Sequence, residues 1–269
     1  MFTKYIDVGP HAINCLHTGP STLPGVAPAL DAGELLVMLH GAGGTAALWR
    51  PQLEHFARAH SAVALDFPGH GRSAGVDGLP AVGDYADILV AFARRLALRP
   101  FVVVGRSLGG AVALTLALAH PDLVRALVVV ATGARFEIGD GLLASIREVV
   151  SGRRGQQFGT EAFSPSTGPE VMRRAWAEQV RTDPRVLYAD LLACRSFDVR
   201  RRLREIRVPT LVIAGADDRV VPVAAAEDLA AGVRGAELAV VPDAGQMVAL
   251  EQAEKFNHIV DAFLERLPS

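Results

Sequence analysis

The residues whose chemistry is clearest are a serine and the two glycines around it, in Gly105-Arg-Ser-Leu-Gly109. A serine hydroxyl attacks a carbonyl carbon when a base accepts its proton and backbone N–H groups stabilise the oxyanion that forms. Residues 101–104 predict a buried strand, and residues 111–119 predict a helix. A sharp turn between them needs glycines and holds the serine at a helix N-terminus, where negative charge is favoured. The stretch therefore predicts a nucleophile, Ser107.

Alternating strands and helices form the scaffold that would position this serine. The predicted strands are 2–8, 12–17, 34–39, 61–65, 101–104, 123–131, 209–214 and 236–241, of which the first two are expected to pair antiparallel. The predicted helices of this scaffold are 46–59, 84–98, 111–119, 223–232 and 251–267. Such alternation with short connections indicates an α/β fold, in which helices flank both faces of a mainly parallel, eight-stranded sheet.

Residues 134–204 interrupt the alternation. They are rich in arginine and contain helical patterns at 142–150, 170–181 and 186–193, but no convincing strand. An insertion that directly follows a sheet strand is placed to cover the strand ends, where ligands bind in open α/β sheets. We therefore expect a core of residues 1–133 and 205–269, with an inserted helical cap at 134–204.

Length and composition limit the classes of function. The 269 residues are 50% hydrophobic and carry a net charge of −2, which gives no electrostatic case for nucleic acid or an anionic membrane. No apolar run is long enough to span a bilayer, and Cys15 and Cys194 are too few for a disulfide framework or a zinc site. We expect a cytoplasmic protein that acts on a small molecule without a metal or organic cofactor. Whether two copies form a homodimer is left open.

Four motifs resemble those of the α/β-hydrolase fold superfamily, and the resemblance extends along nearly the whole chain. They are His40-Gly-Ala-Gly-Gly44, Asp66-Phe-Pro-Gly-His-Gly-Arg-Ser73, Gly105-Arg-Ser-Leu-Gly109 and Gly215-Ala-Asp-Asp-Arg-Val-Val-Pro222. The branch that it resembles most contains capped esterases, enol-lactonases and carbon–carbon-bond hydrolases. The resemblance implies that Ser107 is the nucleophile and Asp218 the acid of the triad. It also implies an oxyanion hole formed by the backbone N–H groups of Ala42 and Leu108.

The sequence departs from the superfamily at the third member of the triad. After the last strand the superfamily has Gly-His-x-x-x-x-Glu, whereas this chain has Gly245-Gln-Met-Val-Ala-Leu-Glu251, so Gln246 stands at the expected histidine position. A carboxamide cannot take up a proton near neutral pH. Loss of a triad base costs on the order of 10⁶ in turnover. We expect structural roles for the eight histidines, so that none of them replaces this base.

Two interpretations of Gln246 follow. In the first, the native protein is a serine hydrolase of a small-molecule ester, lactone or carbon–carbon bond with histidine at this position, and this chain is a disabled form of it. In the second, the glutamine is natural, and the protein binds a ligand or performs a lyase, isomerase or cyclisation step that needs only a polarising pocket. The intact motifs around Gln246 favour the first interpretation.

Four further residues are candidates for contact with the substrate: His40, Gly41, Arg106 and Trp176. The small residues after His40 let the backbone approach a substrate, although His40 itself resembles a structural residue. The Arg106 guanidinium could bind a substrate carboxylate, lower the pKa of Ser107 or form a salt bridge with a loop acid. We expect the salt bridge. Trp176 could line an apolar pocket, or simply pack.

Overall fold

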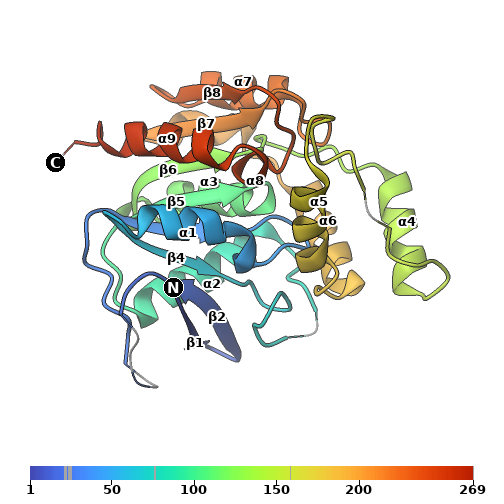
Figure 1. Ribbon diagram of the computed structural model, residues 1–269, viewed down its shortest axis with the longest axis horizontal. Helices are drawn as coiled ribbons and strands as arrows, with labels where there is room; N and C mark the ends of the chain where they lie inside the picture. The colour runs from blue at the N-terminus through green and yellow to red at the C-terminus, as the bar shows by residue number, and fades with distance from the viewer. Residues whose placement is uncertain (21–22, 24–25, 76, 158, 269) are drawn as a thin grey trace.

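A single eight-stranded sheet runs through the computed structural model, which describes residues 1–20, 23, 26–75, 77–157 and 159–268 (Figure 1). The strand order is β1-β2-β4-β3-β5-β6-β7-β8; β2 is antiparallel to β1 and β4, and all other neighbours are parallel. The strands are β1 (Phe2–Val8), β2 (His11–His17), β3 (Leu35–Leu39), β4 (Ser61–Leu65), β5 (Phe101–Arg106), β6 (Val124–Val130), β7 (Thr210–Gly215) and β8 (Glu237–Val241). The prediction of an eight-stranded, mainly parallel sheet is confirmed.

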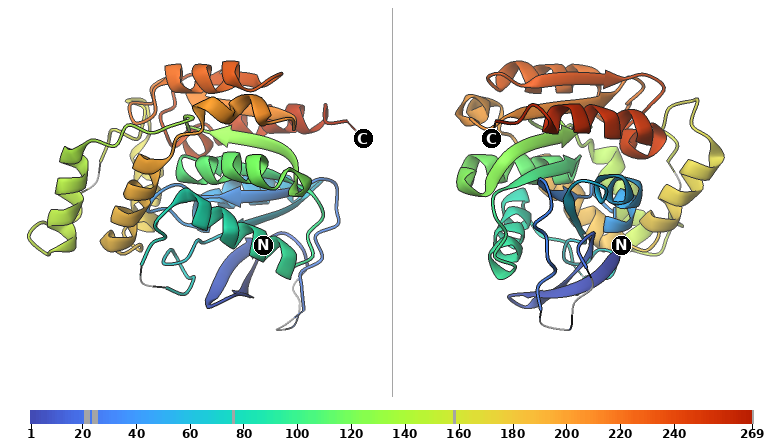
Figure 2. Two further views of the ribbon diagram at one scale, coloured as in Figure 1. Left: turned by 180° about the vertical axis from the view of Figure 1, so that it is seen from behind. Right: turned by 60° about the vertical axis from the view of Figure 1, so that its left-hand side comes forward.

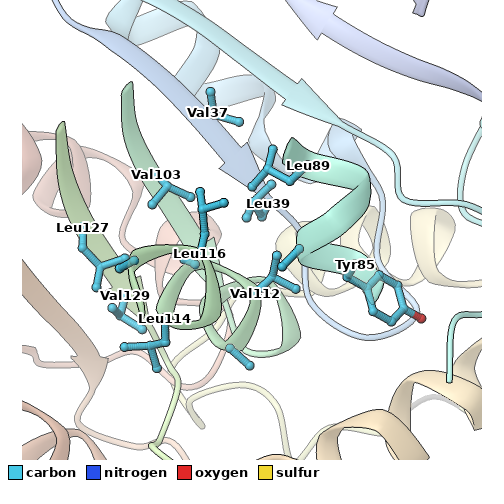
Figure 3. Close-up of a cluster of buried hydrophobic side chains, with 14 of the residues drawn as sticks. Val37, Leu39, Tyr85, Leu89, Val103, Val112, Leu114, Leu116, Leu127 and Val129 are labelled. Atoms are coloured by element: carbon cyan, nitrogen blue, oxygen red, sulfur yellow. The ribbon is translucent and has the colours of Figure 1, made fainter. Parts of the chain in front are cut away.

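Helices cover both faces of the sheet because successive side chains of a strand point to opposite sides. One face packs on α2 (Val82–Arg95), α3 (Leu108–Ala119) and α7 (Val223–Gly232). Figure 3 shows Val103, Leu127 and Val129 of this face against Val112 and Leu116 of α3. The opposite face packs on the short 3-10 helix η1 (Ala46–Trp49), α1 (Arg50–Phe56), α8 (Val248–Glu251) and α9 (Ala253–Leu264).

Two predicted helices are each divided into two pieces. The helix expected over 46–59 begins as η1 and continues as α1, with Pro51, which has no N–H to donate, in the first turn of α1. The helix expected over 251–267 is broken at Gln252, whose φ of −128° and ψ of 52° are not helical, so that α8 ends before α9 begins. Among the residues that the structure describes, no helix has the length and apolarity needed to cross a membrane.

The strand order reverses direction at β3. The chain passes from β3 to β4 on one side and then crosses to β5 on the other, where Leu39 lies opposite Gly105. In open α/β sheets, such a switch point leaves a crevice at the carboxyl ends of the strands. The loops that follow β3 and β5 carry the glycine-rich motif and Ser107, so the topology brings these two motifs together.

The residues between β6 and β7 form helices α4 (Asp140–Val150), α5 (Pro169–Gln179), α6 (Pro184–Ser196) and the 3-10 helix η3 (Arg200–Glu205). The three predicted helices of this segment are therefore present. Both Figures 1 and 2 show α5 and α6 beside one end of the sheet and α4 farther out. A single bridge between Arg135 and Asp198 joins the departing and returning chain, and no strand occurs among the described residues of the segment.

Candidate active site

Ser107 occupies the tight turn between β5 and α3. Its φ of 53° and ψ of −117° lie outside the regions that a residue with a Cβ normally adopts. Glycines permit the turn: a Cβ on Gly105 would lie 2.2 Å from the Gly109 carbonyl oxygen, and one on Gly109 would lie 2.4 Å from that of Leu39. The Ser107 side chain is half-buried rather than enclosed. The turn thus presents a serine at the first residues of α3, as the motif predicts.

Two backbone N–H groups near Ser107 have no acceptor in the described part of the chain. Neither the Leu108 N–H, at the start of α3, nor the Ala42 N–H, in the loop after β3, donates a hydrogen bond to any residue that the structure describes. The next N–H in that loop, Gly43, is already used, since it donates to the Asp190 carboxylate at 2.8 Å. Unpaired donors of this kind can stabilise an oxyanion. Their proposed role in an oxyanion hole stays a prediction.

His40 and Gly41 shape the loop after β3. The His40 ring is fully buried; its Nδ1 donates to the Gly41 carbonyl at 2.9 Å, and its Nε2 accepts from the Phe67 N–H at 3.1 Å. Burial, with the neighbouring His70, holds the pKa of His40 well below its ordinary value, so the ring is neutral. Both ring nitrogens are therefore used within the protein. Any part of His40 in substrate binding is limited to holding the loop.

Asp218 follows β7 with one carboxylate oxygen satisfied and the other free. Oδ1 accepts from the backbone N–H groups of Val220 and Val221 at 2.8 and 2.9 Å. Oδ2 is buried without a hydrogen-bond partner among the described residues. Burial raises the pKa of Asp218 to about 6, although the two N–H groups, Arg106 and Gln246 act in the opposite direction. The side chain is therefore a buried carboxyl with a free acceptor oxygen.

The neighbouring Asp217 is used elsewhere. Its carboxylate accepts a hydrogen bond of 2.6 Å from the Ser164 hydroxyl, in the segment between β6 and β7. The Asp-Asp pair is thus divided, with Asp217 bonded to that segment and Asp218 near Gln246 and Arg106.

Gln246 lies in the loop between β8 and α8, and only 7% of its surface is exposed. Its backbone N–H donates to Ala162 at 3.0 Å, whereas its side-chain Nε2 makes a long contact of 3.5 Å with the Ala131 carbonyl. The amide is near enough to Asp218 to lower the pKa of that carboxyl. Gln246 therefore adjoins Asp218, and its side chain interacts with that carboxyl and, at long distance, with the Ala131 carbonyl.

Glu251 fixes the loop that carries Gln246. One carboxylate oxygen accepts from the N–H groups of Gly245 and Met247, at 2.9 and 3.1 Å, on either side of Gln246. The other accepts from the Ser164 N–H at 2.8 Å and from the Thr167 hydroxyl at 2.5 Å. This carboxylate joins the loop to the segment between β6 and β7. The family pattern ends in a glutamate at this position, but the sequence alone gave it no role.

Arg106 forms no salt bridge with any residue that the structure describes, so the expectation of a pairing with a loop acid is wrong. The residue is only 8% exposed, and among the described residues no carboxylate lies within 4.0 Å of it and no group accepts a hydrogen bond from it. Burial lowers its pKa to about 10, with Asp218 and Glu251 acting in the opposite direction, so the guanidinium stays charged at neutral pH. Trp176 is half-buried on α5 and does not line the hollow beside Arg106.

Asp190 of α6 is a functional candidate that the sequence analysis missed. The carboxylate is fully buried; Oδ2 accepts from the Gly43 N–H and from His70 Nε2, both at 2.8 Å, and Oδ1 accepts from the Tyr85 hydroxyl. Tyr85 lies at the edge of the apolar cluster in Figure 3, its hydroxyl turned away from the aliphatic side chains. His70 also donates to the Pro68 carbonyl, and Asp190 raises the pKa of its ring despite burial. The sequence signal that could have found Asp190 is its position as the one acid within the otherwise apolar residues 189–193.

Comparisons with known proteins agree with this architecture. The sequence matches the alpha/beta hydrolase family over residues 36–259. It is 32% identical over 240 residues to RutD of Rhizobium rhizogenes, provisionally named a carbamate hydrolase, with 85% of this chain and 92% of that protein covered. It is 27% identical over 248 residues to the (E)-2-((N-methylformamido)methylene)succinate hydrolase of Acinetobacter baylyi, with 88% and 92% covered.

A solved structure shares the fold over almost its whole length. The hydrolase from Pseudomonas aeruginosa superposes with a TM-score of 0.81 at 26% identity, with 97% of this chain and 98% of that chain covered. The sequence relatives above are also named as hydrolases. The chain is therefore a hydrolase that belongs to the alpha/beta hydrolase family.

Proposed function

We propose that the site is a serine-hydrolase site for a small-molecule ester, lactone or carbon–carbon bond, with Ser107 as nucleophile and Gln246 in place of the general base. The observation that carries this proposal is Asp218 Oδ2, which is buried next to Gln246 and has no well-formed hydrogen bond to any described residue. A triad acid needs such an oxygen to accept the N–H of a histidine. The acid is thus present while its usual partner is absent.

The remaining parts of the site support attack on a carbonyl. Ser107 Oγ would bond to the carbonyl carbon, and the oxyanion would be stabilised by the unpaired N–H groups of Ala42 and Leu108, each worth roughly 3–4 kcal/mol in such sites. Collapse of this intermediate would break the bond to the leaving group and form an acyl-enzyme, which water then cleaves. The serine proton must move to a base and then to the leaving group. Because Gln246 cannot carry it, turnover in this chain would be very slow.

The alternative of a natural, non-hydrolytic protein predicts a dedicated hydrogen-bond network around Gln246 and an Asp218 that is engaged elsewhere. The contacts argue against it: among the described residues, the side chain of Gln246 makes the long bond to Ala131 and interacts with Asp218, and Asp218 Oδ2 has no well-formed hydrogen bond. We therefore favour a hydrolytic site that lacks its base.

We further propose that residues 134–204 act as a cap over this site. Phe163 and Ala175 of the segment pack against Leu48 and Met247 of the core, and Asp190 bonds the segment to the loop after β3. A cap of this kind would exclude water and select the substrate. Both cysteines are free and buried, which supports a cytoplasmic location.

The names of two relatives support a carbonyl centre in a small substrate. One is provisionally named for a carbamate, and the other is named for a formamido-substituted succinate. In both compounds the carbonyl carbon bears a heteroatom leaving group, which is the kind of centre that an activated serine attacks.

Covalent labelling with a fluorophosphonate probe tests the assignment of Ser107. Three variants are treated in parallel: the present chain, Gln246→His, and the double variant Gln246→His with Ser107→Ala. We expect labelling of Gln246→His on the peptide that contains Ser107, labelling at least a thousandfold slower in the present chain, and none in the double variant. Failure of Gln246→His to react, or reaction of the double variant, would contradict the proposal.

A further inference from the structure

Arg106 differs from every other arginine of the chain. All of them lie in the described part of the structure, and Arg106 alone is buried. Many of the exposed ones pair with acids at the surface, for example Arg153 with Glu148 at 2.8 Å and Arg200 with Asp198 at 2.5 Å. Arg106 has no such partner among the described residues. A buried guanidinium without a hydrogen-bonded partner is unfavourable, so this arrangement calls for a counterion that accepts its N–H groups.

The guanidinium borders a small hollow. The hollow opens to the surface, has little enclosed space, and is lined by Leu48, Trp49, Arg106, Met247, Ala249 and Leu250. The indole N–H of Trp49 is also buried without an acceptor among the described residues. Two side chains with unused hydrogen-bond donors therefore line one hollow, and none of the six side chains around it is an acid. Its lining fits the anionic end of a small ligand.

Gly41 places this guanidinium beside Ser107. A Cβ built on Gly41 would lie 2.9 Å from Arg106 Nη2, 3.1 Å from its Cζ and 3.1 Å from Ser107 Cβ. The guanidinium and the serine thus pack against the same face of one residue. A molecule that reaches Arg106 is therefore close enough to present another of its atoms to Ser107.

We propose that Arg106, with the indole N–H of Trp49, is a subsite for a carboxylate of the substrate. The substrate class is then a small ester or lactone that also carries a free carboxylate, such as a half-ester of a short dicarboxylic acid. This inference rests on the proposed function, because it takes Ser107 as the attacking group. A guanidinium holds a carboxylate through two parallel N–H donors, which orients the substrate as well as binding it.

The acids nearest Arg106 do not fill this role. Asp218 and Glu251 favour the charged form of the guanidinium, but both lie beyond salt-bridge distance. Asp218 is bonded to backbone N–H groups through Oδ1, and both oxygens of Glu251 are bonded to loop N–H and hydroxyl groups. Their charges help to keep Arg106 protonated and leave its N–H groups free for a ligand.

Binding of two matched esters tests the inference without requiring turnover. Monomethyl succinate and methyl butyrate are both methyl esters of four-carbon acids. At the end of the chain away from the ester, the first has a carboxylate and the second has a methyl group. Their dissociation constants are measured by isothermal titration calorimetry on the present chain, on Arg106→Gln and on Arg106→Lys. The control is Arg173→Gln, which removes an exposed arginine on α5.

We expect monomethyl succinate to bind the present chain and Arg173→Gln at least tenfold more tightly than methyl butyrate. Arg106→Gln should abolish that preference by weakening the binding of monomethyl succinate. Arg106→Lys keeps the charge but loses the paired donors, so it should retain part of the preference. If Arg106→Gln does not fold, the comparison is made with Arg106→Lys instead. Equal binding of the two esters by the present chain, or an undiminished preference in the Arg106 variants, would overturn the inference.

The calorimetric result is independent of the proposed nucleophile. If the carboxylate preference is absent while fluorophosphonate labels Ser107 in Gln246→His, the subsite is wrong and the hydrolase proposal stands. If the preference depends on Arg106 while Ser107 stays unlabelled, the anion subsite is present without an activated serine.

Discussion

A hydrogen bond of 2.8 Å joins Asp190 Oδ2 to the backbone N–H of Gly43. Asp190 lies on α6, whereas Gly43 lies in the loop after β3, next to Ala42. The same oxygen accepts from His70, so one buried carboxylate holds α6 against two loops of the core. The position of the Ala42 N–H thereby depends on a helix outside the sheet. This dependence links the proposed cap to the proposed oxyanion hole.

Substitution of Asp190 by asparagine should destabilise the protein. The variant keeps the shape of the side chain but removes the charge that pairs with His70, and breaking a buried pair costs about 3–5 kcal/mol. The pKa of His70 is raised, so the stabilisation is complete below about pH 6.5 and is lost as the pH rises through the higher folded pKa. Urea unfolding at pH 6 and pH 9 should show the larger loss at pH 6.

The control for this prediction is Asp198→Asn, which removes an exposed acid paired with Arg200 in the same segment. It should cost less than about 1 kcal/mol at either pH. If Asp190→Asn is as stable as Asp198→Asn, the buried pair does not hold α6.

Replacement of Ser107 by glycine should stabilise the fold while removing the proposed nucleophile. The φ of 53° with ψ of −117° is strained for a residue with a Cβ, and such strain costs on the order of 1–3 kcal/mol. Glycine relieves the strain but gives the unfolded chain more freedom, so the net gain should be about 1 kcal/mol. Ser107→Ala keeps the Cβ and should give no such gain. Denaturant unfolding compares the two; equal stabilities would mean that the turn is not strained.

Asp218→Asn should raise stability in a pH-dependent manner. The native pKa of about 6 lies above the ordinary value of 3.8, so ionisation penalises the folded state and stability falls as the pH rises between these values. At pH 8 the variant should be more stable by about 3 kcal/mol, and at pH 4 by less than about 1 kcal/mol. Thermal unfolding in matched buffers measures both differences.

An exposed acid supplies the comparison. Asp228→Asn on α7 should change stability by less than about 0.5 kcal/mol at either pH. A gain for Asp218→Asn that is the same at pH 4 and pH 8 would contradict the burial of an ionised carboxyl.

The fold was largely predictable because local patterns determine its strands. A continuous apolar run such as 101–104 is typical of a buried parallel strand. The observed β4 and α7 begin and end at the predicted residues. Helix ends were less predictable: the break at Gln252 depends on tertiary contacts, including its side-chain hydrogen bond to the Asp243 carbonyl.

The site was predictable where its motifs are local and not where partners are distant in sequence. The conformations of the turn at Ser107 and of the loop after His40 are determined by glycines within a few residues of each. Asp190 and His70 are 120 residues apart, so their pairing follows only from the packing of α6. The prediction of a salt bridge for Arg106 was wrong for a related reason. Asp218 and Glu251 lie near Arg106 in the fold, but neither carboxylate is within salt-bridge distance of the guanidinium.

The most direct test of the central claim is hydrolysis of p-nitrophenyl acetate by the present chain and by Gln246→His. An imidazole at this position could donate one N–H to the free Asp218 Oδ2 and accept the Ser107 proton at its other nitrogen. The control Gln157→His adds a histidine at an exposed position outside the site. We predict that Gln246→His raises turnover at least a thousandfold over the present chain and over Gln157→His. Adding Ser107→Ala to Gln246→His should abolish this gain. Turnover by Gln246→His that is no faster than that of Gln157→His would contradict a hydrolytic site that lacks only its base.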